Sequence, residues 1–216
     1  MGIVSHDLRS PLSIISMTAH SMLKPDAPPH TTRSSALRVK RAADRMARMV
    51  SDLLDFTRIA ATGGLPVDRR PIDLRGPVQE AVNEIGISHP GRVMLELPDH
   101  PVEGTWDADR MEQMVSNLVT NALQYGAGDS AIHVRLRDEA TRIVLSVANQ
   151  GPAIGPEHLP TLFDPFQKGP ASAHSGGLGL GLHIVYEVVK AHGGTVEATS
   201  TSEHGTTFTA RFAKSS

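Results

Sequence analysis

The chain has 216 residues, a formal net charge of −2 and no cysteine. Its length allows one or two domains with a sizeable core, the lack of cysteine excludes disulfides and thiolate metal sites, and the near-neutral charge argues against general nucleic-acid binding. No apolar run reaches the roughly 18 residues that a membrane-spanning helix needs, and no signal-peptide pattern opens the chain. We therefore expect a soluble protein, or a soluble fragment of a larger one, without direct membrane insertion.

The first predicted helix extends to about residue 24, where the turn residues at 25–29 end it. Its apolar residues recur at steps of four and three, the spacing of a helix-bundle seam: Leu8, Leu12, Ile15, Ala19 and Met22. At about 100° per residue, His6 points roughly 160° away from this seam, and Ser10 shares its exposed face. Asp7 is close enough to hydrogen-bond the imidazole, and a carboxylate there makes the ring a better nucleophile. The alternative is a solvated surface histidine, one of eleven in the chain.

A second predicted helix covers residues 32–60 and carries Arg and Lys on its outer face. Its apolar seam consists of Val39, Ala43, Met46, Val50 and Leu53. Two such helices form a hairpin with an apolar stripe that the hairpin cannot bury alone. Pairing two hairpins into a dimeric four-helix bundle would bury the stripe. The alternative is that the hairpin packs on a second domain of its own chain.

Residues 61–66 break the helical pattern, and a mixed α and β pattern begins at Asp73. Helices are predicted at 76–87, 109–125 and 180–192, and strands at 93–97, 103–106, 132–137, 143–148, 195–200 and 206–212. Two strands alternate clearly, with one apolar face each: Ile132, Val134 and Leu136 in one, and Ile143, Leu145 and Val147 in the other. Helices against one mostly antiparallel sheet make a two-layer α/β sandwich. The fold class is thus α plus α/β, with a helical domain at 1–62, a linker at 63–72 and an α/β domain at 73–216.

Two asparagine-containing stretches of the α/β domain suit a nucleotide. Asn117 and Asn121 are one turn apart on a predicted helix, and amide oxygens suit magnesium when phosphate oxygens fill the other positions; a cap or a core hydrogen bond is the alternative. Asn149 ends a strand and precedes a glycine turn at Gly151. This arrangement suits reading the edge of a base, and it also fits an ordinary strand-end turn.

A third stretch places Gly177, Gly179 and Gly181 just before a predicted helix, where backbone N–H groups and the helix N-terminus favour phosphate. It is not a Walker A loop, because no Lys-Ser or Lys-Thr follows, and it lacks the leading strand of a Rossmann fingerprint. Small polar residues at 169–175 suit a loop that closes over a ligand, with Phe163 and Phe166 as its anchors. The alternative is a flexible linker.

In chain order, these motifs resemble the H, N, G1, F and G2 boxes of the sensor histidine kinases of two-component signalling. The resemblance covers residues 5–212 and implies a dimerisation and phosphotransfer hairpin followed by an ATP-binding domain of the Bergerat, or GHKL, type. It implies an ATP-dependent protein histidine kinase of the bacterial cytoplasm that forms a homodimer and works with an upstream sensory domain. Its phosphoryl group would pass to an aspartate in the receiver domain of a response regulator.

The resemblance also implies roles for individual residues. His6 would accept the γ-phosphoryl group of ATP, and Asp7 would be the assisting base. Asn117 and Asn121 would hold magnesium and the phosphates. The other implied nucleotide contacts are Tyr125, Asn149, Gly151, Ile154, Phe166, Lys168, Gly177, Leu178, Gly179, Leu180, Gly181 and Thr207.

Two residues depart from the family pattern: Asn149 replaces the usual G1 acid, and Ala153 replaces a G1 glycine. An amide oxygen still accepts a hydrogen bond from the adenine amino group, but charge-assisted bonds are roughly twice as strong, so weaker nucleotide binding is expected. Similar variants occur in phytochrome-like members. Related ATPases have a water-activating glutamate one turn before the magnesium-binding asparagine, whereas this chain has Asn117. Without a base for water, transfer to an imidazole is favoured over hydrolysis.

Two other functions stay open from the sequence. A dimeric signalling scaffold with weakened or lost nucleotide binding would fit the departures at Asn149 and Ala153. A phosphatase acting on the regulator would use Ser10 to orient the hydrolytic water, and this activity is expected to be weak because serine lacks the methyl group that restricts rotamers. The signal, the regulator and the choice of cis or trans transfer stay undetermined, the last because it depends on the loop at 25–31.

Overall fold

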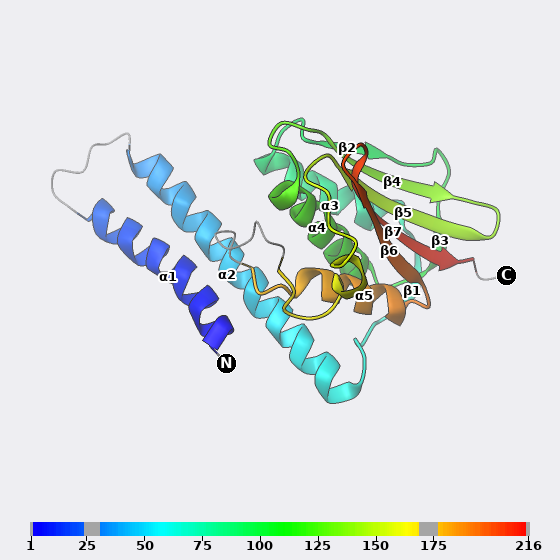
Figure 1. Ribbon diagram of the computed structural model, residues 1–216, viewed down its shortest axis with the longest axis horizontal. Coiled ribbons are helices and arrows are strands. Elements are labelled where there is room, and N and C mark those ends of the chain that lie inside the picture. Colours follow the sequence, from blue (N-terminus) through cyan, green and yellow to red (C-terminus); the bar gives the residue numbers. More distant parts are fainter. Residues whose placement is uncertain (1, 24–30, 169–176, 215–216) are drawn as a thin grey trace.

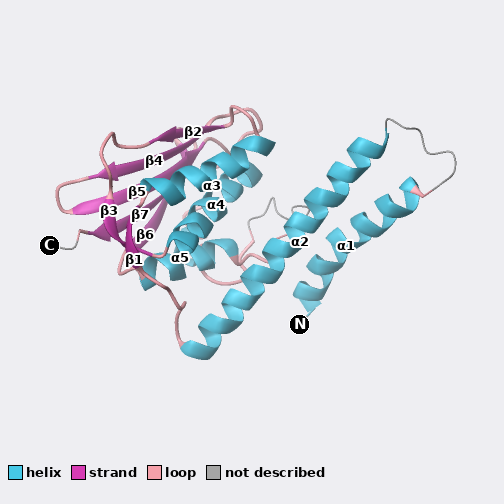
Figure 2. Ribbon diagram, turned by 180° about the vertical axis from the view of Figure 1, so that it is seen from behind, coloured by secondary structure: helices cyan, strands magenta, loops and turns pink. Residues whose placement is uncertain are grey.

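A computed structural model of the chain describes residues 2–23, 31–168 and 177–214. Its elements form a helical hairpin and an α/β domain (Figure 1). The hairpin consists of α1 (Gly2–Met22) and α2 (Thr31–Thr62), which lie side by side. Figure 2 shows the helices of the α/β domain between its sheet and the hairpin. None of the described helices combines the length and the apolar character of a membrane-spanning segment.

The main sheet has five strands in the order β2-β4-β5-β7-β6. β2 pairs with β4 in parallel, and the other neighbours are antiparallel. The strands are β2 (Val93–Glu96), β4 (Ile132–Asp138), β5 (Arg142–Asn149), β6 (Thr195–Thr201) and β7 (Gly205–Ala213). The helices are α3 (Arg75–Ser88), α4 (Ala108–Tyr125) and α5 (Gly181–Ala191), with a short 3-10 helix η1 (Leu159–Thr161). This arrangement confirms the predicted two-layer sandwich behind a helical hairpin.

Alternation in the neighbouring strands β4 and β5 sets the core of the sheet. All six apolar residues predicted to share faces, Ile132, Val134, Leu136, Ile143, Leu145 and Val147, are at most 3% exposed. They belong to one core with Met114 and Leu118 of α4 and with Phe208 of β7. The observed helix and strand ends lie within two residues of those predicted. The apolar pattern therefore positions the sheet and α4, from which much of the site is built.

One short strand escaped the sequence pattern. β1 (Arg70–Asp73) pairs antiparallel with β3 (Glu103–Trp106) in a separate two-stranded sheet. Arg70 and Pro71 are exposed, so the strand has no run of alternating apolar residues that would reveal it. Its first three residues fall within the range assigned above to the linker at 63–72.

None of the predicted seam residues of the hairpin is fully buried, and Leu12 and Val50 are 54% and 45% exposed. The buried apolar residues of α2 are instead Ala42 and Met49, which lie outside the predicted seam, and Met49 packs into the core of the α/β domain. Further large apolar side chains exposed on the hairpin are Ile14, Met17, Met22, Leu23, Leu37 and Leu54. One side of α2 packs against α5 of the same chain. The α/β domain thus covers part of the hairpin and leaves an apolar surface exposed.

Candidate functional site

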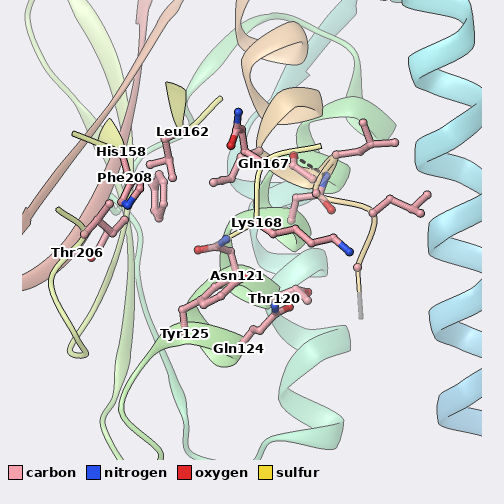
Figure 3. Close-up of a pocket in the computed structure, with 18 of the residues that line it drawn as sticks. Thr120, Asn121, Gln124, Tyr125, His158, Leu162, Gln167, Lys168, Thr206 and Phe208 are labelled. Carbon is pink, nitrogen blue, oxygen red and sulfur yellow. Dashed lines mark hydrogen bonds between the residues drawn. The ribbon is translucent and has the colours of Figure 1, made fainter. Parts of the chain in front are cut away.

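A cavity of about 540 Å³ lies where α4, the loop after β5, the loop before α5 and α2 meet. Figure 3 shows Asn121, Tyr125, Lys168 and Thr206 around it. Eleven of the implied nucleotide contacts line this cavity: Asn117, Asn121, Tyr125, Asn149, Ile154, Lys168, Gly177, Leu178, Gly179, Leu180 and Gly181. Gly151, Phe166 and Thr207 are not among the described residues that line it. Stretches far apart in the sequence therefore meet at one place.

Helix α4 supplies one wall of the cavity. Asn117, Asn121 and Tyr125 recur every four residues and so share a face, while another face buries Met111, Met114, Val115, Leu118, Val119 and Ala122. The amide nitrogen of Asn117 donates to the carbonyl oxygen of Gly181 at 3.3 Å. This bond uses the donor end of the amide and leaves its oxygen for a ligand. The two asparagines thus present their side chains from one packed helix.

The ends of β5 and β7 supply a second wall. Asn149 is 6% exposed and pairs in register with Thr206. The hydroxyl oxygens of Thr206 and Ser200 lie 2.7 Å apart, and the backbone N–H of Ile154 donates to Ser200 Oγ at 2.9 Å. These bonds hold the loop that carries Ile154 against β6 and β7.

Strand alternation separates Thr206 from Thr207. Successive residues of a strand point to opposite faces, so Thr206 and Phe208 line the cavity and Thr207 does not. The signal that distinguishes the two threonines is the apolar Phe208, which marks the inward face of β7. Thr206 is therefore the threonine of this strand that a cavity ligand would meet.

Gly151 shapes the cavity without lining it. A Cβ on Gly151 would lie 2.8 Å from the carbonyl oxygen of Tyr125, so only glycine lets the loop after β5 pass so close to the end of α4. The backbone N–H of Ala127 donates to the carbonyl oxygen of Gln150 at 2.6 Å across the same contact. Gly151 thereby sets the spacing between Asn149 and Tyr125.

The glycine-rich stretch forms the rim in front of α5. Gly179 has a φ of +70°, and a Cβ there would lie 2.6 Å from the carbonyl oxygen of Gln167. Leu178 and Leu180 are buried and fix the stretch to the core. Helix α5 begins at Gly181, so its N-terminus opens on the cavity, a polarity that favours phosphate. The predicted closing loop at 169–175 lies outside the described residues.

The two aromatic residues predicted to anchor this loop contact different partners. Phe163 packs against Phe208, with ring centroids 6.3 Å apart. Phe166 lies edge-on to Phe56 of α2 at 5.0 Å, and Phe56 also contacts His183 of α5 at 6.0 Å. Phe166 has a φ of +64°, a conformation that a bulky residue adopts only when its surroundings impose it. Phe166 thus links the α/β domain to the hairpin through its contact with Phe56.

Helix α2 supplies four cavity residues that the sequence did not indicate: Arg45, Arg48, Met49 and Asp52. Their spacing resembles that of any amphipathic helix, so only the packing of the two domains reveals them. Burial, and then the nearby Asp55, raise the pKa of Asp52 to about 6.

An ion pair joins α2 to α4 beside these residues. Asp55 is 3% exposed. It accepts hydrogen bonds of 2.8 Å from the guanidinium of Arg110 and of 2.8 Å from the amide of Gln113. Because Arg110 and Gln113 belong to α4, this buried pair fixes the hairpin to the helix that carries the asparagines.

A second ion pair connects the cavity rim to α1. The ammonium of Lys168 lies 2.6 Å from a carboxylate oxygen of Asp7, and the side chain of Asp7 is only 9% exposed. Ser10 is exposed one turn further along α1. His6 belongs to α1 by its backbone, and its side chain lies outside the described residues. The cavity thus reaches the helical turn that contains the histidine.

Comparison with protein families matches both parts of the chain. Residues 106–216 match the family described as histidine kinase-, DNA gyrase B-, and HSP90-like ATPase. Residues 1–62 match the His Kinase A (phospho-acceptor) domain.

Individual relatives are longer than this chain. It is 32% identical over 201 residues to a bacteriophytochrome of Pseudomonas aeruginosa and 38% identical over 205 residues to the sensor histidine kinase TrcS of Mycobacterium tuberculosis. Each alignment covers 91% of this chain, but only 27% of the first relative and 40% of the second.

Solved structures show the same fold. The histidine kinase AdeS of Acinetobacter baumannii matches with a TM-score of 0.69 and 20% identity, over 98% of each chain. Full-length ShkA in complex with AMPPNP matches with a TM-score of 0.66 and 23% identity, over 98% of this chain and 45% of that one.

Proposed function

The chain belongs to the histidine kinase-, DNA gyrase B- and HSP90-like ATPase family and, with its phospho-acceptor hairpin, to the sensor histidine kinases of two-component systems; on that premise we propose that it uses ATP to phosphorylate His6. The phosphoryl group then passes to an aspartate of a response regulator. The ion pair between Lys168 and Asp7, at 2.6 Å, carries this proposal most directly. It brings the rim of the nucleotide cavity to the residue next to the histidine.

ATP fits the cavity in one direction. The adenine lies toward Asn149 and Thr206, where a base edge meets an amide and a hydroxyl held by Ser200. The phosphates lie toward Asn117, Asn121 and the N-terminus of α5, where amide groups and the helix dipole favour negative charge. This direction points the γ-phosphate at Lys168 and α1.

Magnesium fits the phosphate end of this arrangement. Asn117 keeps its amide oxygen for a ligand because its nitrogen is bonded to Gly181, and Asn121 faces the same cavity. Among the described residues no group of three or more His, Cys, Asp or Glu side chains gathers to hold a metal ion, so the phosphates themselves would supply most ligands. The ion would neutralise charge on the phosphates.

The residues of the chain then perform an in-line phosphoryl transfer. The bond between the γ-phosphorus and the bridging oxygen breaks, the imidazole of His6 forms a new P–N bond, and ADP leaves with the oxygen. The proton that the imidazole gives up passes to the carboxylate of Asp7. Lys168, which holds this carboxylate in the structure, binds the phosphates when ATP occupies the cavity. Most of the rate enhancement comes from positioning and charge stabilisation.

Dimerisation is part of the proposal and rests on the exposed hairpin surface. Leu12, Leu37, Val50 and Leu54 are each about half exposed, and large exposed apolar side chains on a helical hairpin favour burial against a second copy. A four-helix bundle of two hairpins would cover them. This leaves the α/β domains on the outside of the bundle.

The test is incubation of the full chain with γ-labelled ATP and magnesium, followed by separate treatment with alkali and with acid. We expect label that survives alkali, is lost in acid, and does not form in His6→Ala. The His89→Ala variant is the matched control, because His89 is exposed and far along the chain from the hairpin. Label that persists in His6→Ala would contradict the assignment.

The scaffold alternative makes a different prediction. A chain that has lost nucleotide binding would show no thermal stabilisation by millimolar ATP with magnesium. Since the cavity collects the asparagines, the glycine stretch and Lys168, we expect clear stabilisation.

A further inference from the structure

The cavity has a positively charged side that comes from two parts of the chain. Among the described residues that line it, the charged side chains are Arg45, Arg48 and Asp52 of α2 and Lys168 of the loop before α5. Three are cations and one is an acid. Lys168 is already paired with Asp7. The hairpin therefore adds two arginines and one aspartate, an excess of one cation, to a cavity whose other walls come from the α/β domain.

Arg45 differs from Arg110, another arginine at the junction of the two parts. The guanidinium of Arg110 is satisfied by Asp55 and Gln113. The Nε atom of Arg45, in contrast, is buried and has no hydrogen-bond partner among the described residues. Burial lowers the pKa of Arg45, the negative charge of Asp7 raises it and the charge of Arg48 lowers it. A buried N–H without an acceptor is costly, so the position is suited to an acceptor that arrives with a ligand.

The position of Arg45 also relates it to the reacting groups. It lines the cavity and lies within the electrostatic reach of Asp7, which is next to His6 and bound to Lys168. Arg45 is thus at the boundary that a phosphoryl group crosses on its way from the cavity to α1. A guanidinium presents several N–H groups in one plane and matches the oxygens of a phosphate.

We propose that Arg45 is a catalytic residue supplied by the hairpin, which binds the oxygens of the γ-phosphoryl group while it moves from ATP to His6. The proposal rests on the function proposed above. The bond from the γ-phosphorus to the bridging oxygen breaks, the P–N bond to the imidazole forms, and the released proton passes to Asp7. Arg45 stays protonated and changes only its hydrogen-bond partners. The catalytic site is then complete only when α2 is docked on the α/β domain.

The first measurement is the single-turnover rate of His6 labelling at saturating ATP in full-chain variants. Arg45→Gln should lower this rate by about 100-fold or more, because an arginine that stabilises transferring phosphoryl charge acts mainly in the transition state. Arg45→Lys should recover part of the loss. The control is Arg38→Gln, which removes an exposed arginine seven residues earlier on the same helix, about 10 Å along its axis, and should leave the rate unchanged.

The second measurement is binding, which does not depend on activity. The dissociation constant of ADP should be the same in Arg45→Gln and in the wild type, since ADP has no γ-phosphate. The dissociation constant of AMPPNP should rise several-fold. A variant that merely unfolds would lose ADP binding as well.

The outcomes separate this inference from the proposed function. If the wild type is labelled on His6 and Arg45→Gln matches its rate within twofold, the inference is wrong and the kinase assignment stands. Equal losses of ADP and AMPPNP affinity in Arg45→Gln would also overturn it, because they indicate a structural role. If the wild type shows no label at all, the proposed function fails and the role of Arg45 fails with it.

Discussion

The hairpin and the α/β domain differ in how completely their apolar side chains are buried. In the α/β domain the helices and the sheet share one core, in which Leu118 of α4 and Val147 of β5 are fully buried. In the hairpin Ala42 and Met49 are buried, while Leu12 and Val50 are about half exposed. The shared core fixes the walls of the cavity that belong to the α/β domain. In the hairpin, α1 and α2 are held by their contacts with each other and by the contacts of α2 with the α/β domain. We infer that nucleotide binding belongs to the packed part and that the rate of transfer depends on the docking of the hairpin.

The largest expected effect on nucleotide binding comes from Asn121→Ala. If the Asn121 amide binds the phosphates and magnesium as proposed, removing it should raise the dissociation constant of ATP by about 10- to 100-fold, the range for a hydrogen bond to a charged group. Titration with a fluorescent ATP analogue measures it. Asn83→Ala on α3 is the control, because Asn83 is exposed and accepts a local hydrogen bond from Gln79 of the same helix. Unchanged affinity in Asn121→Ala would remove α4 from the nucleotide site.

A smaller effect in the opposite direction is expected from Asn149→Asp. It restores the acid that is usual at this position, and a charge-assisted hydrogen bond to the adenine amino group should lower the dissociation constant of ATP by about fivefold. GTP, whose base presents a carbonyl oxygen there, should gain nothing. Equal changes for ATP and GTP would show that Asn149 does not read the base edge.

Weakening the contact between the hairpin and the α/β domain should lower the rate of phosphoryl transfer without changing the affinity for ATP. Phe56→Leu removes the edge-on contact with Phe166 at 5.0 Å and the contact with His183, and aromatic pairs of this kind contribute about 0.5–1.5 kcal/mol. The labelling rate should fall about two- to tenfold while the dissociation constant of ATP stays the same. Thr57→Ala, an exposed neighbour, is the control. A matching loss of ATP affinity would mean that the hairpin is needed to build the cavity.

The smallest effect concerns stability inside the packed domain. His192 is 8% exposed; its Nδ1 lies 2.8 Å from the carbonyl oxygen of Val188, and its Nε2 accepts from the backbone N–H of Asp107 at 3.1 Å. Burial, more than any other cause, lowers the pKa of this imidazole. As the pH falls, His192 therefore takes up a proton at a higher pH in the unfolded chain than in the folded chain.

The lowered pKa of His192 determines how the free energy of unfolding depends on pH. The contribution of His192 to the free energy of unfolding is present above about pH 6.5, the ordinary histidine range, and is lost as the pH falls toward the lower folded pKa, by at most about 1.4 kcal/mol per pH unit. Chemical denaturation at several pH values should show a shallower dependence in His192→Gln than in the wild type. The exposed His89→Gln should keep the wild-type slope. A slope that His192→Gln leaves unchanged would contradict this reading.

The same comparison explains what could be predicted from the sequence. Strand alternation placed Val134 and Val147 in the core, and the four-residue spacing of Asn117 and Asn121 placed both on one face of α4, because these patterns are local. The alternation of β7 also separates Thr206 from Thr207, and the apolar Phe208 marks the face of the strand that meets the cavity.

Residues at the junction of the two parts could not be predicted in this way. Arg45 and Asp52 have the spacing of any amphipathic helix, and no local pattern predicts the contact of Phe166 with Phe56 of α2. Their roles follow from how the hairpin lies against the domain. No local pattern encodes that arrangement, since the contacts join positions far apart in the chain, such as Lys168 and Asp7.

We propose that ATP bound in the α/β domain delivers its γ-phosphoryl group to His6 of the hairpin. The most direct test is to locate that group on the intact wild-type chain after incubation with ATP and magnesium, by trypsin digestion and mass spectrometry under alkaline conditions. Cleavage after Arg9 gives the peptide of residues 1–9, in which His6 is the only histidine. We expect one acid-labile phosphate on His6 in this peptide. A phosphate on another histidine, or an acid-stable phosphate on Ser5, would contradict the account.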